Sequence, residues 1–505
     1  MKFLGLNITR SAKPKPTGES VVTVKRSFDA ARTDRLFSDW TTDAGYTAAE
    51  ARDQLWRVRG RMRDMCKNNP FARKWLWMLK SNIVGDLGFV LSARSGELVP
   101  GSGYAAPEFR LDEKANDEIE RGWHEWASNP QWVDMSGRKT FKAICDLALT
   151  QWQRDGEAII RIVDGNTKHG NPYKFGLKMY QPEALDADYI VDDTGRGTSI
   201  VNGVEIDSWG EPVRYWFKQR STSQLSNDPY GSLAGKRVSL PAKDIIHLFS
   251  HEDEQQNRGW PGMASCLDRM KMLDGYDEAE SVAARDAANS VGTYTRDPNT
   301  VTDETQIATP SAVAQSVQDA EPGLRQVLPP GWGFEENNPM RPNPAYSEYH
   351  KAALRGIASG ALVSYNMLAE DLESVSWSSL REGKLSTTDM YKLSQVTMIE
   401  QMVTRIFQRW LLMFLSFGPT SLPLDKYPKF KRHLFFAKRW QWVNPSQEGA
   451  FNEKARNYGW KTDQTIAAEL GQEYTDNVMA IKTTGPKVAG TYLEANYAKA
   501  ETNPT

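Results

Sequence analysis

The sequence has few cysteines and no long apolar run. Its 505 residues include three cysteines, Cys66, Cys145 and Cys266, and none stands in a CxxC pair. A disulfide scaffold or a structural zinc site is therefore not expected, and a reducing compartment is favoured. The most apolar segment, residues 410–417, is far shorter than the roughly 20 residues that a membrane helix needs. The N-terminus also lacks the apolar core of a signal peptide, so we expect a soluble chain that does not bind a membrane.

The charge of the chain is balanced overall and uneven locally. Lysine and arginine number 62 against 64 aspartate and glutamate residues, a net charge of −2, which argues against a cationic coat for nucleic acid. Residues 1–35 nevertheless carry eight basic and three acidic side chains, and residues 51–80 carry nine and two. Either segment could contact nucleic acid or an acidic protein. A solvated surface is the alternative for both.

Motifs that build an enzyme's active site are missing. No GxxxxGKS/T, GxGxxG or GxSxG sequence occurs. The densest group of metal-ligand types is His247, His251, Glu252 and Glu254, and it begins at the end of a β-like run. Residues four apart converge on a helix face but not on a strand, so a polar loop is favoured over a metal site.

The remaining carboxylates and the cysteines indicate no catalytic group either. Asp155, Glu157, Asp192 and Asp193 stand beside turns and are interpreted as ordinary turn carboxylates. The cysteines are expected to be small core or boundary residues. Because no nucleophile, base and orienting group come together, we expect a protein that is not an enzyme and that has no cofactor and no metal.

Hydrophobic periodicity and turn residues predict an α+β chain. Thr47 and Glu50 fit a capping box, and Pro70 suits the first turn of a second helix. The expected helices cover residues 47–69, 70–88, 111–127, 140–155 and 264–295, the last ended by Asp297 and Pro298. The expected strands cover residues 157–163, 173–180, 189–191, 200–206, 213–217, 245–249, 326–328 and 333–335. Residues 91–111 are expected to be a loop.

Residues 344–417 are predicted to form a helix, a polar interruption and a long helix. The interruption, residues 367–384, is first acidic, then rich in serine, then basic. Apolar residues three and four apart predict one buried face on the helix 385–415: Val396, Ile399, Val403, Ile406, Trp410 and Met413. A polar loop held between two helices is not expected inside a core, so a functional surface is indicated.

Several segments, in this order, resemble the lambda-type family of bacteriophage portal proteins. They are residues 63–85 (RDMCKNNPFARKWLWMLKSNIVG), 155–162 (DGEAIIRI), 177–186 (LKMYQPEALD), 244–263 (DIIHLFSHEDEQQNRGWPGM), 354–383 (LRGIASGALVSYNMLAEDLESVSWSSLREG) and 442–471 (WVNPSQEGAFNEKARNYGWKTDQTIAAELG). Their combined order is specific, although no single motif is. The resemblance covers roughly residues 45–490, and the N-terminal arm matches poorly.

The resemblance implies a portal fold. Its parts would be an arm (1–44), a wing (45–261), a first stem helix (262–292), a clip (293–343), a second stem helix (344–364), a tunnel loop (365–382), a long helix returning into the wing (383–442), a crown (443–490) and a polar tail (491–505).

The resemblance also implies a function in the virion. A ring of twelve subunits would stand at one capsid vertex, assembled in the host bacterial cytoplasm, and double-stranded DNA would pass through it without sequence-specific binding. Its expected partners are further copies of the chain, the large terminase, the major capsid and scaffold proteins, and later the head-completion or tail adaptor proteins. A metal-dependent hydrolase or nuclease and another head–tail adaptor ring are the alternatives.

Two groups of residues are the candidate site. The tunnel-loop residues expected to face DNA are Glu370, Asp371, Glu373, Ser374, Ser376, Ser378, Ser379, Arg381 and Lys384. The stem-helix acids that could line the channel are Asp268, Asp274, Asp277, Glu278, Glu280 and Asp286, with a solvated outer face as the alternative. Acids on a pore wall would repel DNA phosphates, which suits passage better than tight binding.

Overall fold

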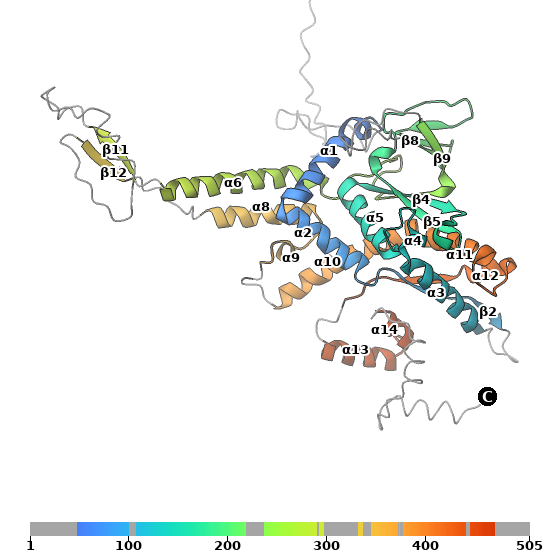
Figure 1. The fold of residues 1–505 in the computed structure, drawn as a ribbon. Coiled ribbons are helices and arrows are strands. Elements are labelled where there is room, and N and C mark those ends of the chain that lie inside the picture. The colour runs from blue at the N-terminus through green and yellow to red at the C-terminus, as the bar shows by residue number, and fades with distance from the viewer. Residues whose placement is uncertain are drawn as a thin grey trace, which may run out of the picture. The chain divides into compact units, whose positions relative to one another are not determined.

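A computed structural model gives the fold of the chain (Figure 1). It describes residues 48–99, 108–218, 237–289, 292–296, 332–336, 345–371, 373, 377–440 and 445–469. The expectations for the arm, for the cap at Thr47, for the strand 326–328, for residues 470–490 of the crown and for the polar tail lie outside these ranges.

The described chain begins with two helices that meet at a capped junction. α1 (Ala48–Asn68) and α2 (Pro70–Leu79) flank Asn69, whose side chain accepts hydrogen bonds from the N–H groups of Phe71 and Ala72. Pro70 occupies the first turn, where its missing N–H costs no helical hydrogen bond. A π-helical turn, η2 (Lys80–Val84), follows α2. Both predicted helices are confirmed.

The next helices lead into the first sheet. α3 (Glu113–Ser128) and α5 (Phe141–Asp155) agree with the predicted helices, and the short α4 (Pro130–Val133) between them was not anticipated. α5 ends at Gly156, whose φ of +91° is in the left-handed region that favours glycine. A Cβ on Gly156 would lie 2.3 Å from the carbonyl oxygen of Gly259, so the two backbones are in contact. Gly156 therefore lets β4 start against the turn that precedes α6.

Two antiparallel sheets follow, and most of their strands lie where the sequence predicts strands. One has the order β10-β4-β5, and the other the order β6-β7-β8-β9. Their strands are β4 (Glu157–Asp164), β5 (Phe175–Tyr180), β6 (Ser199–Val201), β7 (Val204–Ile206), β8 (Pro212–Lys218), β9 (Arg237–Pro241) and β10 (Ile245–Phe249). The turn at Asn202 and Gly203 joins β6 to β7, because an Asn-Gly pair readily forms a two-residue hairpin turn. Residues 189–191 contribute only a bridge from Val191 to Ile200, and β9 was not anticipated.

The loop expected over residues 91–111 is wrong. β1 (Val90–Ala93) pairs with β13 (His433–Phe436), and β2 (Gly96–Val99) pairs with β3 (Glu108–Leu111). Glycine, serine and proline made the segment look irregular. The β1 partner lies more than three hundred residues away in sequence, so local pattern could not reveal the pairing.

The helix expected over residues 264–295 ends earlier than predicted. A 3-10 turn, η7 (Ala264–Cys266), leads into α6 (Leu267–Asn289), and β11 (Gly292–Arg296) follows. β11 pairs antiparallel with β12 (Trp332–Glu336), which confirms the predicted strand 333–335. The helix therefore stops before Asp297 and Pro298, because residues 292–296 form a strand that pairs with β12. Local sequence pattern could not show this pairing, since the two strands are far apart in the chain.

The predicted polar loop is shorter than expected. α8 (Tyr346–Gly360) and α9 (Tyr365–Ala369) precede it, and α10 already starts at Trp377 and runs to Met398. Serine and threonine are weak helix formers but not helix breakers, and residues 365–418 contain no proline. The tunnel loop assigned to residues 365–382 therefore includes α9 and the first turns of α10.

The long helix contains a π-helical turn that shifts its buried face. α10 passes through η9 (Ile399–Val403) into α11 (Thr404–Phe417). Before the turn the buried residues include Tyr391, Gln395 and Met398, the turn itself buries Met402 and Val403, and after it the buried residues include Ile406, Trp410 and Met413. A π-helical turn holds one extra residue, so the apolar stripe moves by one position. Val396 is consequently 49% exposed and the stripe predicted through it is wrong there.

Short elements complete the described chain. They are η3 (Lys168–Gly170), η4 (Pro182–Ala184), η6 (Ala242–Asp244), η10 (Leu424–Lys426), α12 (Tyr427–Phe430), α13 (Pro445–Asn457) and α14 (Asp463–Glu469).

Aromatic rings form the centre of the main hydrophobic core. Trp410 of α11 stacks on Phe414 with ring centroids 4.9 Å apart and meets Trp123 of α3 edge to face at 5.2 Å. Trp126 of the same helix packs on Phe175 of β5 at 5.3 Å. Such pairs stabilise beyond their buried area, so this cluster fixes α11 against α3 and the first sheet.

A buried charge cluster lies beside this core. The carboxylate of Glu157 accepts hydrogen bonds from Arg59 of α1 at 2.7 Å and from Arg258, and it pairs with His247 of β10 at 2.9 Å. Burial by itself would raise the pKa of Glu157, but Arg258, Arg59 and His247 hold it well below the ordinary carboxyl value. The expectation that Glu157 is an ordinary turn carboxylate is wrong.

Asp155 belongs to a second, adjacent group of ion pairs. Its side chain is buried and pairs with Arg63 of α1 and Arg154 of α5, both at 2.7 Å. Its pKa is lowered because hydrogen bonds from these two arginines outweigh burial. Arg59 and Arg63 therefore stabilise the fold, and the basic surface predicted for residues 51–80 is smaller than the sequence suggests. The turn position of Asp155 was correct, but four arginines pair with the two carboxylates, and three of them, Arg59, Arg63 and Arg258, come from distant elements.

Replacing Glu157 by Gln tests the buried charge cluster. The change leaves Arg59 and Arg258 buried without a counter-charge, so we expect the free energy of unfolding to fall by about 3–5 kcal/mol. Urea unfolding at fixed protein concentration measures it. The exposed Asp192→Asn change is the matched control, and a loss of less than about 1 kcal/mol for Glu157→Gln would contradict the role assigned to the cluster.

Truncating Trp410 to Ala tests the aromatic core. The side chain is fully buried, so we expect a loss of about 3–5 kcal/mol from lost contacts and a cavity. Trp209→Ala is the control, since Trp209 is 92% exposed, and its effect is expected to stay within about 0.5 kcal/mol. Equal unfolding midpoints for the two variants would refute the assignment.

Candidate functional site

Two antiparallel helices, α6 and α8, form the first part of the site. They run side by side in Figure 1, and the end of α8 at Gly360 lies against Cys266 before α6, whereas Tyr346 at the start of α8 contacts Asp277 further along α6. A Cβ added to Gly360 would lie 2.8 Å from that of Cys266, so α8 approaches the start of α6 closely only because it has glycine there. Further along, the Tyr346 hydroxyl donates to Asp277 at 3.1 Å. The Trp75 indole N–H donates to the carbonyl of Ala361, which fixes the end of α8 on α2.

The acids predicted on the first stem helix have different environments. Asp277 faces α8, where it contacts Tyr346 and also His350 at 3.4 Å. Asp274 accepts a hydrogen bond from Asn69 at 3.5 Å, between α1 and α2. Asp268 and Glu278 are exposed, and Glu280 is half-buried. Asp286 lies in α6, but its side chain is outside the described part. Asp274 and Asp277 therefore contact other elements of the chain, and Asp268 and Glu278 are the exposed candidates.

The acidic loop begins with a residue in a strained conformation that is held by an ion pair. Glu370 follows α9 with φ +54° and ψ +28°, a left-handed conformation that non-glycine residues rarely adopt. Its carboxylate pairs with Lys74 of α2 at 2.8 Å. The hydrogen bond from Lys74 lowers the pKa of Glu370. Lys74 thus ties the start of the loop to the helix that also holds α8.

The next acid of the loop is held by two further elements. The Tyr365 hydroxyl donates to Asp371 at 2.7 Å, and Lys351 of α8 lies 3.7 Å from Asp371 and 3.6 Å from Glu373. The hydrogen bond from Tyr365 lowers the pKa of Asp371 most, followed by one from the Glu373 N–H. Partial burial and the Asp371 carboxylate raise the pKa of Tyr365 to about 12. The three acids therefore lie close to cations of their own chain.

The other candidate residues of the loop do not join this cluster. Ser374 and Ser376 are outside the described residues. Ser378, Ser379 and Arg381 lie in the first turns of α10, and Lys384 is an exposed residue of the same helix. The structure thus brings together Glu370, Asp371 and Glu373.

Sequence reasoning missed the groups that hold the loop. Lys74, Lys351 and Tyr365 come from α2, α8 and α9 and were not among the candidates. A local signal existed only for Tyr365, which stands six residues before Asp371. The two lysines could not be assigned because their contacts depend on how α2 and α8 fold back onto the loop.

The alternative metal site is not supported by the geometry. His247 belongs to the buried charge cluster, and His251 lies beyond the strand, where its Nδ1 is 3.5 Å from the Gln401 amide nitrogen. Among the described residues, no group of three or more His, Cys, Asp or Glu residues is placed to hold a metal ion. Within the same residues no helix is long and apolar enough to cross a membrane.

The comparison with known families gives the decisive observation. A family model described as "Phage portal protein, lambda family" matches residues 33–395. The chain belongs to the lambda family of phage portal proteins. This confirms the resemblance, and because portal proteins are structural proteins of the virion, it also confirms the non-enzymatic role.

Individual relatives agree with the family. A "Probable portal protein" of Halomonas phage phiHAP-1 is 26% identical over 433 residues, which cover 84% of this chain and 80% of the relative. "Portal protein B" of Escherichia phage lambda is 22% identical over 406 residues, covering 74% and 71%. Among solved structures, one titled "Neck of empty GTA particle computed with C6 symmetry" has a TM-score of 0.49 at 13% identity, covering 84% of this chain and 94% of that chain. A similarity this remote carries no conclusion about assembly.

The pH dependence of hydrogen exchange in the loop tests the ion pairs and hydrogen bonds of Glu370 and Asp371. Because the pKa values of Glu370 and Asp371 are lowered, the ties are complete above an ordinary carboxyl pKa of about 4 and are lost as the pH falls through the lowered values. We expect the hydrogen-exchange protection of residues 365–373 to be constant from about pH 7 to 5 and to fall below about pH 4.

A variant at Tyr365 separates the hydrogen bond to Asp371 from the ion pair between Lys74 and Glu370. Tyr365→Phe keeps the ring and removes the largest cause of the lowered Asp371 pKa, so the loss of protection is expected at higher pH. Unchanged protection in Tyr365→Phe at every pH would mean that this hydrogen bond does not hold the loop.

Proposed function

We propose that this portal protein forms a closed ring of twelve subunits at one capsid vertex and serves as the channel for packaging and ejection of double-stranded DNA. The observation that carries the proposal is the antiparallel α6–α8 pair, which leads into an acidic loop tied to α2. This arrangement supports a channel wall, since a loop with three acids and left-handed backbone is costly in a core and tolerable where it meets water.

The parts of a portal map onto the described elements. The stem corresponds to α6 and α8, and the clip includes the β11–β12 hairpin between them. The wing corresponds to α1–α5, the two larger sheets, and α10–α11 with its π-helical turn. α13 and α14 correspond to the crown. The tunnel loop is narrowed from the predicted residues 365–382 to residues 370–376, between α9 and α10.

The electrostatics of the loop suit passage rather than gripping. Phosphate contacts with lysine and arginine dominate affinity for DNA, so a wall rich in free cations would hold the duplex. In each chain Lys74 and Lys351 are paired with loop acids, which leaves the loop without a surplus of positive charge. We propose that DNA slides past such a wall without sequence-specific contacts.

The partners of the ring follow from its position. The clip would meet the large terminase during packaging and the head-completion or tail adaptor proteins afterwards. The wing would contact the major capsid protein, with scaffold proteins guiding assembly in the host bacterial cytoplasm. These assignments are part of the proposal.

Imaging and a loop variant test the proposal together. Negative-stain images of the purified protein are expected to contain rings with a central hole and countable symmetry. The triple change Glu370→Gln, Asp371→Asn and Glu373→Gln is expected to leave the rings intact, because exposed ion pairs contribute only about 0–1 kcal/mol each. It frees Lys74 and Lys351 to contact phosphate, so DNA packaged per prohead in a fixed time is expected to fall.

A matched control variant also loses three negative charges, but at a surface away from the loop. Asp192→Asn, Asp193→Asn and Glu211→Gln remove three exposed acids beside the four-stranded sheet and are expected to package as the wild type does. A protein that stays monomeric under all assembly conditions would refute the ring. Rings of the loop variant that package and retain DNA normally would refute the role of the loop.

A further inference from the structure

We propose that Trp77, on the outer face of α2, inserts into a groove on a second copy of the chain, between α10 and residues 250–265. The inference rests on the proposed ring and names one contact that would hold neighbouring subunits together. It commits to a second copy as the occupant of the groove.

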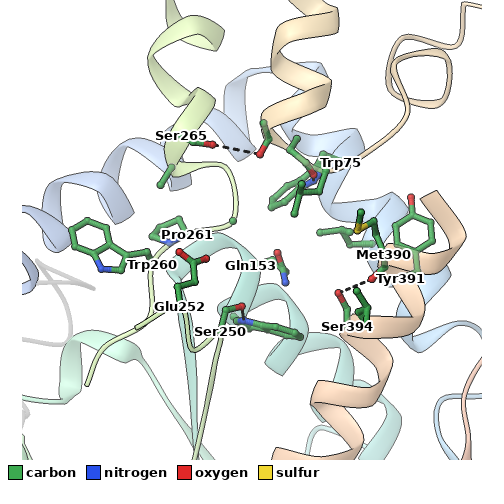
Figure 2. A pocket seen from close by; sticks show the side chains of 18 residues that line it. Trp75, Gln153, Ser250, Glu252, Trp260, Pro261, Ser265, Met390, Tyr391 and Ser394 are labelled. Carbon is green, nitrogen blue, oxygen red and sulfur yellow. Dashed lines mark hydrogen bonds between the residues drawn. The ribbon is translucent and has the colours of Figure 1, made fainter. Parts of the chain in front are cut away.

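The groove is a cavity of about 450 Å³ where three parts of the chain meet. Figure 2 shows Trp75 and Met390 on one side and Trp260, Pro261 and Glu252 on the other, with Gln153 and Ser250 between them. A volume of this size is in the range of pockets that bind small molecules, so it can hold one indole ring. The lining is mostly apolar and aromatic.

The mouth of the groove exposes apolar side chains. Leu393 and Met390 of α10 are 65% and 42% exposed, and Leu362, at the end of α8, is 63% exposed. These residues lie on the rim of one concave site instead of being scattered singly. An apolar rim around a hollow is typical of a protein–protein contact.

The proposed occupant projects from the opposite face of α2. Trp75 and Leu79 point inward and line the groove, whereas Trp77, between them in sequence, is 61% exposed. Positions two apart on a helix lie about 200° around the axis from one another. Tryptophan is among the residues most often found as an energetic anchor that fills a pocket in an interface.

Charge complementarity selects this occupant. Arg73 is exposed one turn before Trp77, and the Lys80 ammonium lies 5.0 Å from the centre of the Trp77 ring. The rim of the groove carries Glu252, followed in sequence by Asp253 and Glu254. A cationic flank on the inserted side chain and an anionic flank on the groove would steer the approach and fix its orientation.

The arrangement also explains why the contact would generate a ring. The groove and Trp77 lie on opposite faces of the same helix, so one copy cannot use both surfaces with the same partner. Such a contact is heterologous, and it propagates from copy to copy until the rotation closes. A dimer joined by one such contact would leave one groove and one Trp77 unused, each available to a further copy.

Cross-linking of the full-length protein tests the contact. The double variant Trp77→Cys and Leu393→Cys is expected to give a ladder of multimers with a short bismaleimide, because the two positions meet between copies. The native cysteines interfere little, since Cys145 and Cys266 are buried and burial of Cys66 raises its pKa to about 12. Trp209→Cys with Leu393→Cys is the control and is expected to give no ladder.

A second measurement does not depend on cross-linking. Trp77→Ala is expected to weaken subunit association by roughly 30-fold, as loss of an anchor residue does, while Trp209→Ala leaves it unchanged. Unfolding midpoints of the monomeric fraction show whether Trp77→Ala itself is folded.

The outcomes separate this inference from the proposed function. Wild-type rings without a ladder from the Trp77→Cys and Leu393→Cys variant would overturn the contact and leave the ring. An absence of wild-type rings would overturn the proposed function. Trp40 lies in the N-terminal segment before α1 and is a second tryptophan that could occupy the groove. A cross-linked monomer from Trp40→Cys with Leu393→Cys would assign the groove to this segment of the same chain and would overturn the inference.

Discussion

The buried carboxylate of Glu157 is the constraint on which the rest of the described structure depends. It joins Arg59 of α1, His247 of β10 and Arg258, which precedes α6, to the first residue of β4. A charge buried in this way is tolerated only when its partners stay in place. The cluster therefore fixes the start of the α6 arm relative to both α1 and the first sheet. The close approach of Gly156 to Gly259 adds a backbone contact at the same point.

From this fixed base, the elements around the loop are held by few but specific contacts. Trp75 donates to the carbonyl of Ala361 at the end of α8. Gln395 of α10 donates to three backbone carbonyls, those of Asn82, Ile83 and Lys438, and so fixes α10 on the π-helical turn after α2. The loop between these anchors is held by exposed ion pairs, which are weak in water. A rigid frame thus carries a weakly held acidic segment, which suits the DNA channel that we propose.

Helix α2 takes part in both of the surfaces to which we assign a function. Its residue Lys74 holds the loop acid Glu370, and its Trp77 is the proposed contact to a second copy. Lys74 and Trp77 are less than one helical turn apart, so a shift of α2 against the neighbouring copy would also move the Lys74 side chain that pairs with Glu370. In the ring that we propose, this shared rigid element would couple the subunit contact to the position of the loop.

The sequence by itself determined the family, the order of helices and strands, and the existence of an acidic loop, because periodicity, turns and caps are local signals. It did not reveal the pairing of β1 with β13, the one-residue shift of the buried face at Ile399–Val403, or the partners of Glu157. Each of these depends on residues that are distant in sequence or on an extra residue in one helical turn. Only the tertiary structure decided that two carboxylates beside a turn are buried among cations and that lysines of α2 and α8 hold the loop acids, since such contacts form only when separate elements pack together.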